Sequence, residues 1–470
     1  MKVEQIYTGC LAQGAYYIQC CGEAAIIDPL REVAPYLERA KKDGVKIKYI
    51  FETHFHADFV SGHLTLAEKT GAPIIYGQNA SPAFDAYIAK DGEEFKLGKV
   101  SIKAIHTPGH TMESTTYLLI DEQGKDHAIF SGDTLFLGDV GRPDLAQKAA
   151  DMAQEQLAGL LYDSLRNKIM TLADEVMVYP AHGAGSACGK NMMKATVDTL
   201  GNQKKTNYAL RADMTKAEFI KEVTDGLLPP PAYFPLNVKM NKEGYESIDR
   251  VLEKGRHALS PKAFELAANE TGAVILDVRH QNDFARCHVP RSIFIGLNGS
   301  FAPWVGALIK DVAQPILLIV AEEKIEEALT RLSRVGFDNV IGYLKGGLDA
   351  WMADGKETDH VLSISATELK AVLDKDPTTF VLDVRKAPEY LSEHIRGATH
   401  APLSNLNEHL TSLPEQANCY LHCAGGYRSM IASSILKSRG MHHLIDVAGG
   451  FKAIKATAIS TTDYVCPSTL

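Results

Sequence analysis

Residues 53–63 read THFHADFVSGH, and the β-rich run KIKYIFET at 46–53 leads into them. A short run of this kind is typical of a buried strand, so the histidines stand where a strand ends. In an extended segment, residues two apart project to the same side, and His54 and His56 are therefore expected to converge. The stretch predicts a metal site at the edge of a sheet.

Three further segments carry metal-ligand side chains, two at turn-like positions and the third, with His182, after another β-rich run. They are HTPGHT with His110, FSGDTLF with Asp133, and VYPAHG with His182. Over residues 1–245, short β-rich runs alternate with helical patterns, which predicts a mixed α/β domain. Imidazole and carboxylate groups on loops that follow successive strands form a metal pocket.

The set THxHxD, TPGHT, SGDTLF and YPAHG, in this order and at these intervals, resembles the metallo-β-lactamase superfamily. The resemblance covers about residues 1–245 and implies an αββα sandwich with the metal at one edge of its two sheets. Hydrolases of that superfamily carry HxHxDH and bind two zinc ions, whereas the last position here is Phe59. A phenyl ring has no lone pair to donate, so we expect a weak or empty second site and a single metal ion.

The phrase SGDTLFLGDVGRPDL at 131–145, together with Phe59 and PPPAYFPLNVKMN, resembles persulfide dioxygenases fused to rhodanese domains. This resemblance implies one Fe(II) per chain, held by His54, His110 and Asp133. Such a triad leaves adjacent positions open for O2 and a persulfide sulfur. The resemblance gives pocket and ligand-orienting roles to the remaining polar groups, His56, Asp58 and His182.

Two residues near this set have two interpretations each. Arg142 is expected to pair with the anionic end of a thiol carrier such as glutathione or coenzyme A, or else to order its own loop through a salt bridge. Cys188 either faces the pocket and carries sulfur or is a buried, inert thiol.

The rest of the chain contains an internal repeat. AVILDVRHQNDFARCHVPRSIFI matches FVLDVRKAPEYLSEHIRGATHAPL, so that Asp277 aligns with Asp383, and KGGLDAW matches AGGFKAI. Apolar strand runs separated by amphipathic helices predict a parallel sheet in each copy. We expect domains at 1–245, 258–356 and 362–470, with a Pro-rich, extended stretch near residues 227–240 closing the first.

In the last copy, CYLHCAGGYRSM predicts a strand, a glycine-containing loop and a helix that starts near Ser429. Backbone N–H groups, the helix dipole and the charge of Arg428 favour the thiolate of Cys423. The loop resembles the active-site loop of rhodaneses, which implies that Cys423 accepts and passes on a sulfane sulfur. The sulfur-binding loop would consist of Ala424, Gly425, Gly426 and Tyr427.

The middle copy has no such nucleophile. Its corresponding segment is LLIVAEEKIEEALTRL, which puts Ile319 or Val320 at the position of the cysteine. Glu322 and Glu323 would repel an anion. We expect this copy to be an inactive spacer or docking element.

Composition limits the possible partners and the compartment. A net charge of -9 and a pI near 6.0 argue against a nucleic-acid backbone or an anionic membrane surface as partner. Without a signal sequence or a long apolar run in the sequence, we expect a cytoplasmic protein. Its partners would be a small-molecule thiol persulfide, O2 and sulfite or thiosulfate, and the chain would form a homo-oligomer, a dimer or tetramer.

Three functional hypotheses follow from these patterns. The first is a persulfide dioxygenase with thiosulfate sulfurtransferase activity, used in sulfide and persulfide detoxification, in which the rhodanese step either forms or uses thiosulfate. The second is a zinc-dependent thioester hydrolase of the glyoxalase II type with an accessory rhodanese sulfur carrier. The third keeps the rhodanese half as a binding or docking module without turnover.

Overall fold

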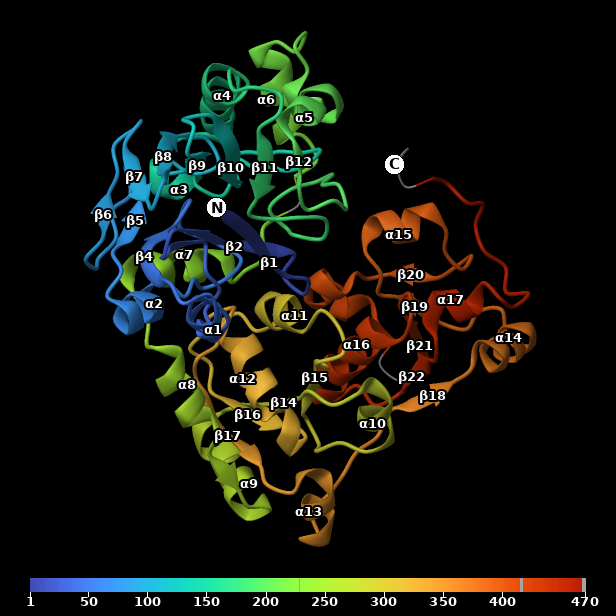
Figure 1. The fold of residues 1–470 in the computed structure, drawn as a ribbon. Coiled ribbons are helices and arrows are strands. Elements are labelled where there is room, and N and C mark those ends of the chain that lie inside the picture. The colour runs from blue at the N-terminus through green and yellow to red at the C-terminus, as the bar shows by residue number, and fades with distance from the viewer. Residues whose placement is uncertain (228, 415–416, 467–470) are drawn as a thin grey trace. The chain divides into compact units, whose positions relative to one another are not determined.

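The computed structural model describes residues 1–227, 229–414 and 417–466 (Figure 1). The chain divides into two compact units, Met1–Arg250 with Leu332–Phe337, and Val251–Arg331 with Asp338–Leu470. The domain limits drawn from the sequence stay predictions. Leu228 of the Pro-rich stretch and residues 415–416 and 467–470 of the predicted third domain lie outside the described residues.

The first unit is built on two mixed sheets. One sheet follows the order β1 (Lys2–Thr8), β2 (Gln13–Cys20), β3 (Glu23–Ile27), β4 (Lys46–Phe51), β5 (Ile74–Tyr76), β6 (Tyr87–Ile88). The other follows β12 (Asp198–Thr199), β11 (Met177–Pro180), β10 (Asp126–Gly132), β9 (Thr115–Ile120), β8 (Val100–His106), β7 (Glu94–Leu97). The helices of this unit are α1 (Ala34–Asp43), α2 (His63–Thr70), α3 (Gln147–Ala150), α4 (Gln154–Ser164), α5 (Leu200–Thr206), α6 (Lys216–Thr224) and α7 (Phe234–Glu243), with short helices η1 (Leu165–Ile169) and η2 (Tyr208–Leu210).

Alternation along β2 shows how these elements form layers. Tyr16 and Ile18 pack into a core that also contains Tyr117 and Phe130 of the opposite sheet, whereas the intervening Tyr17 packs towards the helices α1 and α2. Successive side chains of a strand point to opposite faces, so one strand serves both cores. On the far side, α4 and α6 cover the second sheet. The predicted αββα sandwich is confirmed.

The second half of the Pro-rich stretch is helical, which corrects the prediction of extended structure there. Residues 229–232 form no helix or strand, but α7 begins at Phe234 and contains Pro235 in its first turn. Proline is tolerated there because the first helical N–H groups have no intrahelical acceptor. Pro235 therefore stands at the start of a helix and does not prevent it.

The second unit contains two five-stranded sheets of the same topology. The first has the order β13 (Ala258–Leu259), β17 (Val340–Leu344), β16 (Ile316–Ile319), β14 (Val274–Asp277), β15 (Ile293–Phe294). The second has the order β18 (Leu362–Ile364), β22 (Leu444–Val447), β21 (Cys419–His422), β19 (Val381–Asp383), β20 (Thr399–His400). Neighbouring strands pair in parallel in both sheets, as predicted.

Helices separate these strands, as expected for parallel connections. The first copy contains α9 (Pro261–Thr271), α10 (Gln281–Arg286), α11 (Phe301–Leu308), η3 (Glu322–Lys324), α12 (Ile325–Ser333) and α13 (Gly347–Ala353), and α8 (Ile248–Gly255) precedes it. The second contains α14 (Ala366–Lys375), α15 (Ala387–Ser392), η4 (Leu403–Ser412), α16 (Tyr427–Ser438) and α17 (Gly450–Ile454).

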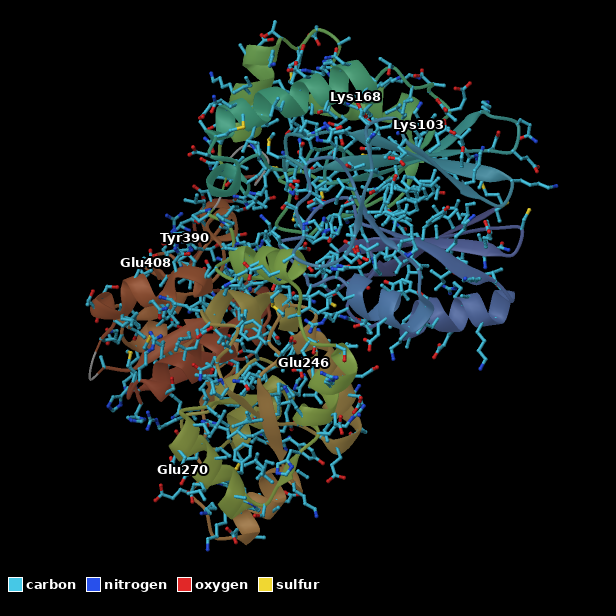
Figure 2. All side chains as sticks on the ribbon, turned by 90° about the vertical axis from the view of Figure 1, so that its left-hand side faces the viewer. Lys103, Lys168, Glu246, Glu270, Tyr390 and Glu408 are labelled. Atoms are coloured by element: carbon cyan, nitrogen blue, oxygen red, sulfur yellow. The ribbon has the colours of Figure 1, made fainter. Side chains whose placement is uncertain are left out.

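Charged side chains lie over the outside of the second unit, among them the exposed Glu270 and Glu408 (Figure 2). Across the part of the chain that the structure describes, no helix combines the length and apolarity needed to cross a bilayer.

Candidate metal centre and sulfur-transfer loop

Three of the predicted ligands converge at one edge of the first unit. His54 follows β4, His110 follows β8 and Asp133 follows β10, and each is at most 2% exposed. Nε2 of His54 lies 3.8 Å and Nε2 of His110 lies 3.4 Å from Oδ2 of Asp133. The three ligand atoms all lie within 4.8 Å of one another, so one ion can contact all three.

Each imidazole is oriented by a contact at its other nitrogen. Nδ1 of His54 lies 3.0 Å from Oγ1 of Thr53, and Nδ1 of His110 donates to the carbonyl of Arg142 at 2.8 Å. A partner at Nδ1 fixes the ring and leaves Nε2 facing the centre. Gly141 permits the close approach of this loop, because a Cβ there would lie 2.0 Å from the Asp133 carbonyl oxygen.

The two carboxylate oxygens of Asp133 have different surroundings: one contacts the protein and the other faces the centre. Oδ1 accepts from Nδ1 of His182 at 2.8 Å, whereas the buried Oδ2 has no hydrogen-bond partner among the described atoms. Burial opposes ionisation, but the charge of His182 and its hydrogen bond hold the pKa of Asp133 well below its usual range. Burial lowers the pKa of His54, so that ring stays neutral. An ionised carboxylate with an orphaned oxygen beside a neutral imidazole fits a bound cation.

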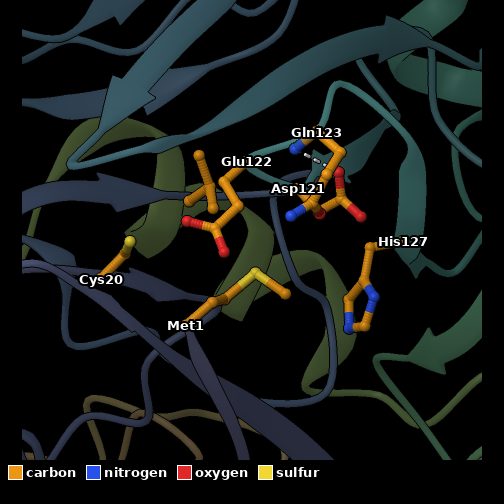
Figure 3. Close-up of a pocket in the computed structure, with 7 residues that line it drawn as sticks. Met1, Cys20, Asp121, Glu122, Gln123 and His127 are labelled. Atoms are coloured by element: carbon orange, nitrogen blue, oxygen red, sulfur yellow. Dashed lines mark hydrogen bonds between the residues drawn. The ribbon is translucent and has the colours of Figure 1, made fainter.

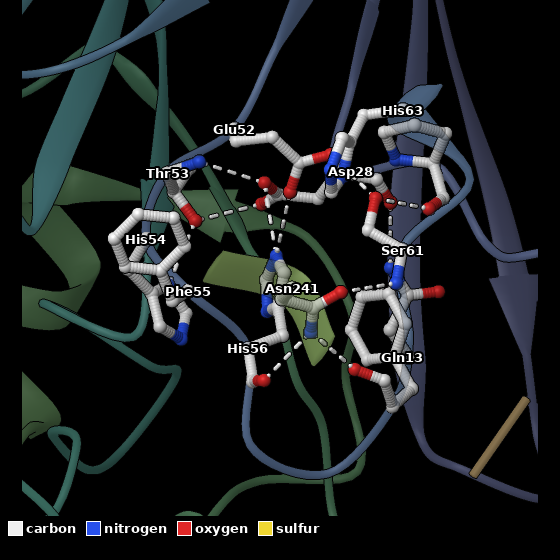
Figure 4. Close-up of polar contacts among 12 residues, drawn as sticks. Gln13, Asp28, Glu52, Thr53, His54, Phe55, His56, Ser61, His63 and Asn241 are labelled. Carbon is white, nitrogen blue, oxygen red and sulfur yellow. Dashed lines mark hydrogen bonds and ion pairs between the residues drawn. The ribbon is translucent and has the colours of Figure 1, made fainter. Parts of the chain in front are cut away.

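His56 lies beside this group without joining it. Its ring lies 4.2 Å from that of His54, centre to centre, but its Nε2 faces Oδ1 of Asp28 at 3.1 Å and Oε2 of Glu52 at 3.5 Å (Figure 4). All three side chains are fully or almost fully buried. Burial and the charge of Asp28 raise the pKa of Glu52 well above its usual value. The convergence that strand alternation predicts therefore holds for the two rings but not for their Nε2 atoms.

A second group of potential ligands adjoins the first. Asp58, His182 and Cys188 offer one atom each within 4.8 Å of one another, and Nε2 of His182 contacts Oδ2 of Asp58 at 2.8 Å. Burial raises the pKa of the Cys188 thiol well above its usual value. Cys188 thus faces the pocket as a buried thiol, a position that spacing alone left open.

The loop that the sequence predicts to transfer sulfur, here called the sulfur-transfer loop (residues 423–427), joins β21 to α16. The Gly426 N–H donates to Sγ of Cys423 at 3.1 Å, and the Phe451 and Lys452 N–H groups donate to the Cys423 and Ala424 carbonyls. Gly450 allows this contact, because a Cβ there would lie 2.4 Å from the Cys423 carbonyl oxygen. The helix begins at Tyr427, two residues before the predicted start.

Arg428 is held by a carboxylate. Its guanidinium makes two hydrogen bonds to Glu389, at 2.6 and 2.8 Å. Burial opposes the charge of Glu389, but Arg428 keeps the pKa of that carboxyl below its usual value. An incoming anion would therefore compete with Glu389 for this guanidinium.

The strand registers of the two copies correspond, and they show what occupies the cysteine position. Ile319 pairs with Asp277, and His422 pairs with the equivalent Asp383. The next residue is Val320 in one copy and Cys423 in the other, which decides between the two predicted positions. The middle copy therefore presents an apolar side chain at this point.

Comparison with known protein families agrees with this architecture. A model of the metallo-beta-lactamase superfamily matches residues 8–182, and a model of the rhodanese-like domain matches residues 260–354 and 365–457. The chain joins a metallo-beta-lactamase superfamily domain to two rhodanese-like domains. This confirms the predicted domain families and their order.

Individual relatives of the chain include more than one type of enzyme. The metallo-beta-lactamase domain resembles persulfide dioxygenase ETHE1, mitochondrial, of Homo sapiens, at 29% identity over 47% of this chain and 78% of that protein. A hydroxyacylglutathione hydrolase of Rhizobium etli is 40% identical over 34% of this chain and 57% of that protein. A crystal structure described as a metallo-beta-lactamase from Staphylococcus aureus matches with a TM-score of 0.64 and 29% identity, covering 73% of this chain and 98% of that one.

Within the metallo-beta-lactamase domain, Arg142 makes contacts that order its loop. Its guanidinium pairs with both oxygens of Asp144 at 2.7 and 2.8 Å and donates to the Ala187 carbonyl at 3.3 Å. The side chain is 6% exposed. These contacts favour the loop-ordering interpretation, and binding of a thiol carrier stays a proposal.

A surface pocket elsewhere on this domain is lined by Met1, Cys20, Val100, Asp121, Glu122, Gln123 and His127 (Figure 3). Cys20 Sγ lies 3.5 Å from Cys21 Sγ. The pocket residues do not form any of the potential ligand groups found among the described residues.

Proposed function

We propose that the metallo-beta-lactamase domain is a persulfide dioxygenase with one Fe(II) per chain, and that Cys423 of the last rhodanese-like domain transfers sulfane sulfur. One observation carries the first half: His54, His110 and Asp133 converge in a buried group that His56 does not join. Two imidazoles and one carboxylate form a facial triad, the ligand set of non-haem Fe(II) oxygenases. The similarity to persulfide dioxygenases supports the substrate class.

In this proposal, a thiol persulfide, O2 and water give the free thiol, sulfite and two protons. A ferrous ion would supply the redox chemistry towards O2. The protein holds the ligands in place: Thr53 orients His54, the Arg142 carbonyl orients His110, and His182 orients Asp133. His56, Asp58 and His182 line the pocket as proposed orienting groups.

At the second centre, the thiolate of Cys423 would attack the outer sulfur of a persulfide, forming a cysteine persulfide and releasing the thiol. Sulfite would then take that sulfur and leave as thiosulfate, which restores the thiolate. The Gly426 N–H that already contacts Sγ, together with the rest of loop 424–427, would stabilise the anionic sulfur. The loop serves the reverse reaction as well, so both directions belong to the proposal.

The alternative is a zinc-dependent thioester hydrolase of the glyoxalase II type. Its support is the 40% identity to a hydroxyacylglutathione hydrolase and the adjacent group Asp58, His182 and Cys188. Phe59 removes one ligand from that second position, and His56 faces Asp28 and Glu52. The dioxygenase is therefore the function that the geometry supports best.

The test is oxygen uptake by anaerobically purified protein with glutathione, coenzyme A and cysteine persulfides, with sulfite, thiosulfate and bound metal quantified. We expect one iron per chain and uptake with at least one of these thiol carriers. Two zinc ions per chain, no uptake and hydrolysis of a hydroxyacylglutathione thioester would establish the alternative. Fractionation of cells would test the proposed cytoplasmic location, and light scattering would test the proposed dimer or tetramer.

A further inference from the structure

The metallo-beta-lactamase domain contains a buried polar cluster of which the proposed mechanism uses only His56. It consists of Asp28, Glu52, His56, Ser61 and His63, all at most 1% exposed (Figure 4). Its two carboxylates lie at the ends of neighbouring strands, β3 and β4. Such a cluster is costly to bury, so its arrangement calls for a specific role.

The cluster holds His56 from several sides. Asp28 and Glu52 face its Nε2 at 3.1 and 3.5 Å, and the ring of Phe59 packs on it at 4.3 Å with an interplanar angle of 32°. Asn241 of α7 donates to the carbonyls of His56 and Phe59, both at 2.8 Å. Both the side chain and the backbone of His56 are therefore fixed.

The carboxylates are held in turn by other groups. Glu52 accepts from Oγ of Ser61 at 2.5 Å and faces Nδ1 of His63 at 3.3 Å. Asp28 accepts from the N–H and Oγ1 of Thr53, both at 2.8 Å. The same Thr53 hydroxyl contacts Nδ1 of His54, so the cluster is continuous with the proposed metal centre.

We propose that Glu52 and Asp28 are positioning residues that withhold His56 from the metal. The 4.2 Å between the His54 and His56 rings leaves His56 close enough to become a third imidazole ligand once either partner is lost. A centre with three imidazoles is a typical zinc site, whereas two imidazoles and one carboxylate leave positions open on iron. Glu52 thereby determines the ligand number of the centre, and this inference rests on the proposed dioxygenase function.

The test replaces Glu52. Asp28 is less suitable because it also contacts Thr53, whose hydroxyl contacts the proposed ligand His54. In Glu52→Ala, His56 should turn towards the centre and add a ligand. We expect Co(II) and Zn(II) to bind about tenfold more tightly than in the parent protein, the scale of changes around metal ligands. The d–d absorption of bound Co(II) should also intensify. The added imidazole displaces more than one bound water, so the coordination number of the ion falls.

Two controls isolate His56. Ser61→Ala removes another partner of Glu52 while leaving both carboxylates beside His56, and should keep the parent's Co(II) spectrum. The double variant Glu52→Ala/His56→Ala should return to that spectrum. A purely structural role of Glu52 would lower the melting temperature without a spectral change that depends on His56.

Three outcomes would overturn the inference. They are an unchanged Co(II) spectrum in folded Glu52→Ala, a changed spectrum that persists in the double variant, and a loss of one bound cation per chain in His56→Ala. The last would show that the cluster itself binds a metal. Oxygen uptake by the parent protein tests the proposed function separately: its failure would refute the dioxygenase whatever the cobalt spectra show.

Discussion

At the scale of single residues, the metal centre depends on atoms that do not face it. Each proposed ligand uses one polar atom for a protein contact and leaves another towards the centre, as Thr53 and His54 illustrate. A side chain that loses its outer partner gains rotational freedom and a second tautomer. Iron affinity should therefore respond to residues that never touch the ion.

Thr53→Val tests this directly. The valine keeps the branched shape but removes the hydroxyl that contacts His54 and Asp28, so we expect iron affinity to fall about tenfold. Competition with a ferrous chelator measures it. Thr65→Val is the matched control, because the Thr65 hydroxyl is buried without a hydrogen-bond partner among the described residues. Equal affinities in both variants would contradict the role given to Thr53.

Asp446 gives a pH dependence with a defined sign. Burial raises its pKa from 3.8 to about 6, so the folded protein holds the proton more tightly than the unfolded chain. The protonated Asp446 therefore stabilises the folded state, and this contribution is fully present below about pH 4 and is lost as the pH rises through about 6. In Asp446→Asn this loss should be absent. The change in the free energy of unfolding between pH 4 and pH 7 should therefore differ from that of the parent protein by about 2 to 3 kcal/mol.

Hydrogen exchange of the β22 amides between pH 4 and 7, corrected for intrinsic rates, measures this effect. The exposed Asp374 provides the control substitution Asp374→Asn, which should keep the parent's pH dependence. A parent and an Asp446→Asn protein with the same dependence would assign the effect to another group.

Much of both sites follows from sequence, because their residues stand at strand ends and in short loops. His54, His110 and Asp133 come together because β4 of one sheet and β8 and β10 of the other end at the same edge of the sandwich. Spacing does not give rotamers, and so it does not show that His56 turns towards Asp28 and Glu52. The only local signal for that cluster is a carboxylate at the end of each strand, in AIID and IFET.

Long-range contacts of the last domain could not be predicted from the sequence either. Glu389 lies 39 positions from Arg428, and no local pattern pairs them. The Tyr427 hydroxyl donates to the Gly296 carbonyl at 2.6 Å, and its ring occupies the space beside Gly299. The middle copy therefore contacts the sulfur-transfer loop, although it has no nucleophile of its own.

At the scale of elements, the loop before α16 is shaped by the start of α17. Gly450 has a φ of +55°, and a Cβ there would collide with the Cys423 carbonyl at 2.4 Å. Gly347, the equivalent residue of the middle copy, has a φ of +58°, but a Cβ at that position would point into open space. An alanine would be similarly strained in its backbone at both positions, but only at position 450 would its Cβ collide with the Cys423 carbonyl.

Gly450→Ala should therefore displace the Cys423 loop and lower cyanide-dependent thiocyanate formation about 100-fold, the effect of a displacement of about 1 Å at a reacting group. Gly347→Ala carries a similar backbone penalty and should retain most of the activity. Oxygen uptake at the metal centre should stay unchanged in both. Equal losses in the two variants would show that strain, and not the loop contact, limits sulfur transfer.

At the scale of the whole molecule, the proposed product of one centre is a substrate of the other. The metal centre would release sulfite, and Cys423 would combine it with a second sulfane sulfur. Sulfite is a small, diffusible anion, so nothing in its chemistry requires both centres on one chain. Cys423→Ser should therefore keep oxygen uptake and release sulfite in place of thiosulfate.

Mixing two full-length variants, each inactive at a different centre, tests whether both centres must be active on the same chain. Cys423→Ser supplies only the metal centre and His110→Ala only the sulfur-transfer loop, so neither alone should convert glutathione persulfide to thiosulfate under air. Together they should form thiosulfate, at a rate that rises with the concentration of His110→Ala protein because sulfite crosses through solution. A mixture that consumes oxygen and accumulates sulfite, while the parent protein forms thiosulfate, would instead require transfer within one chain or assembly.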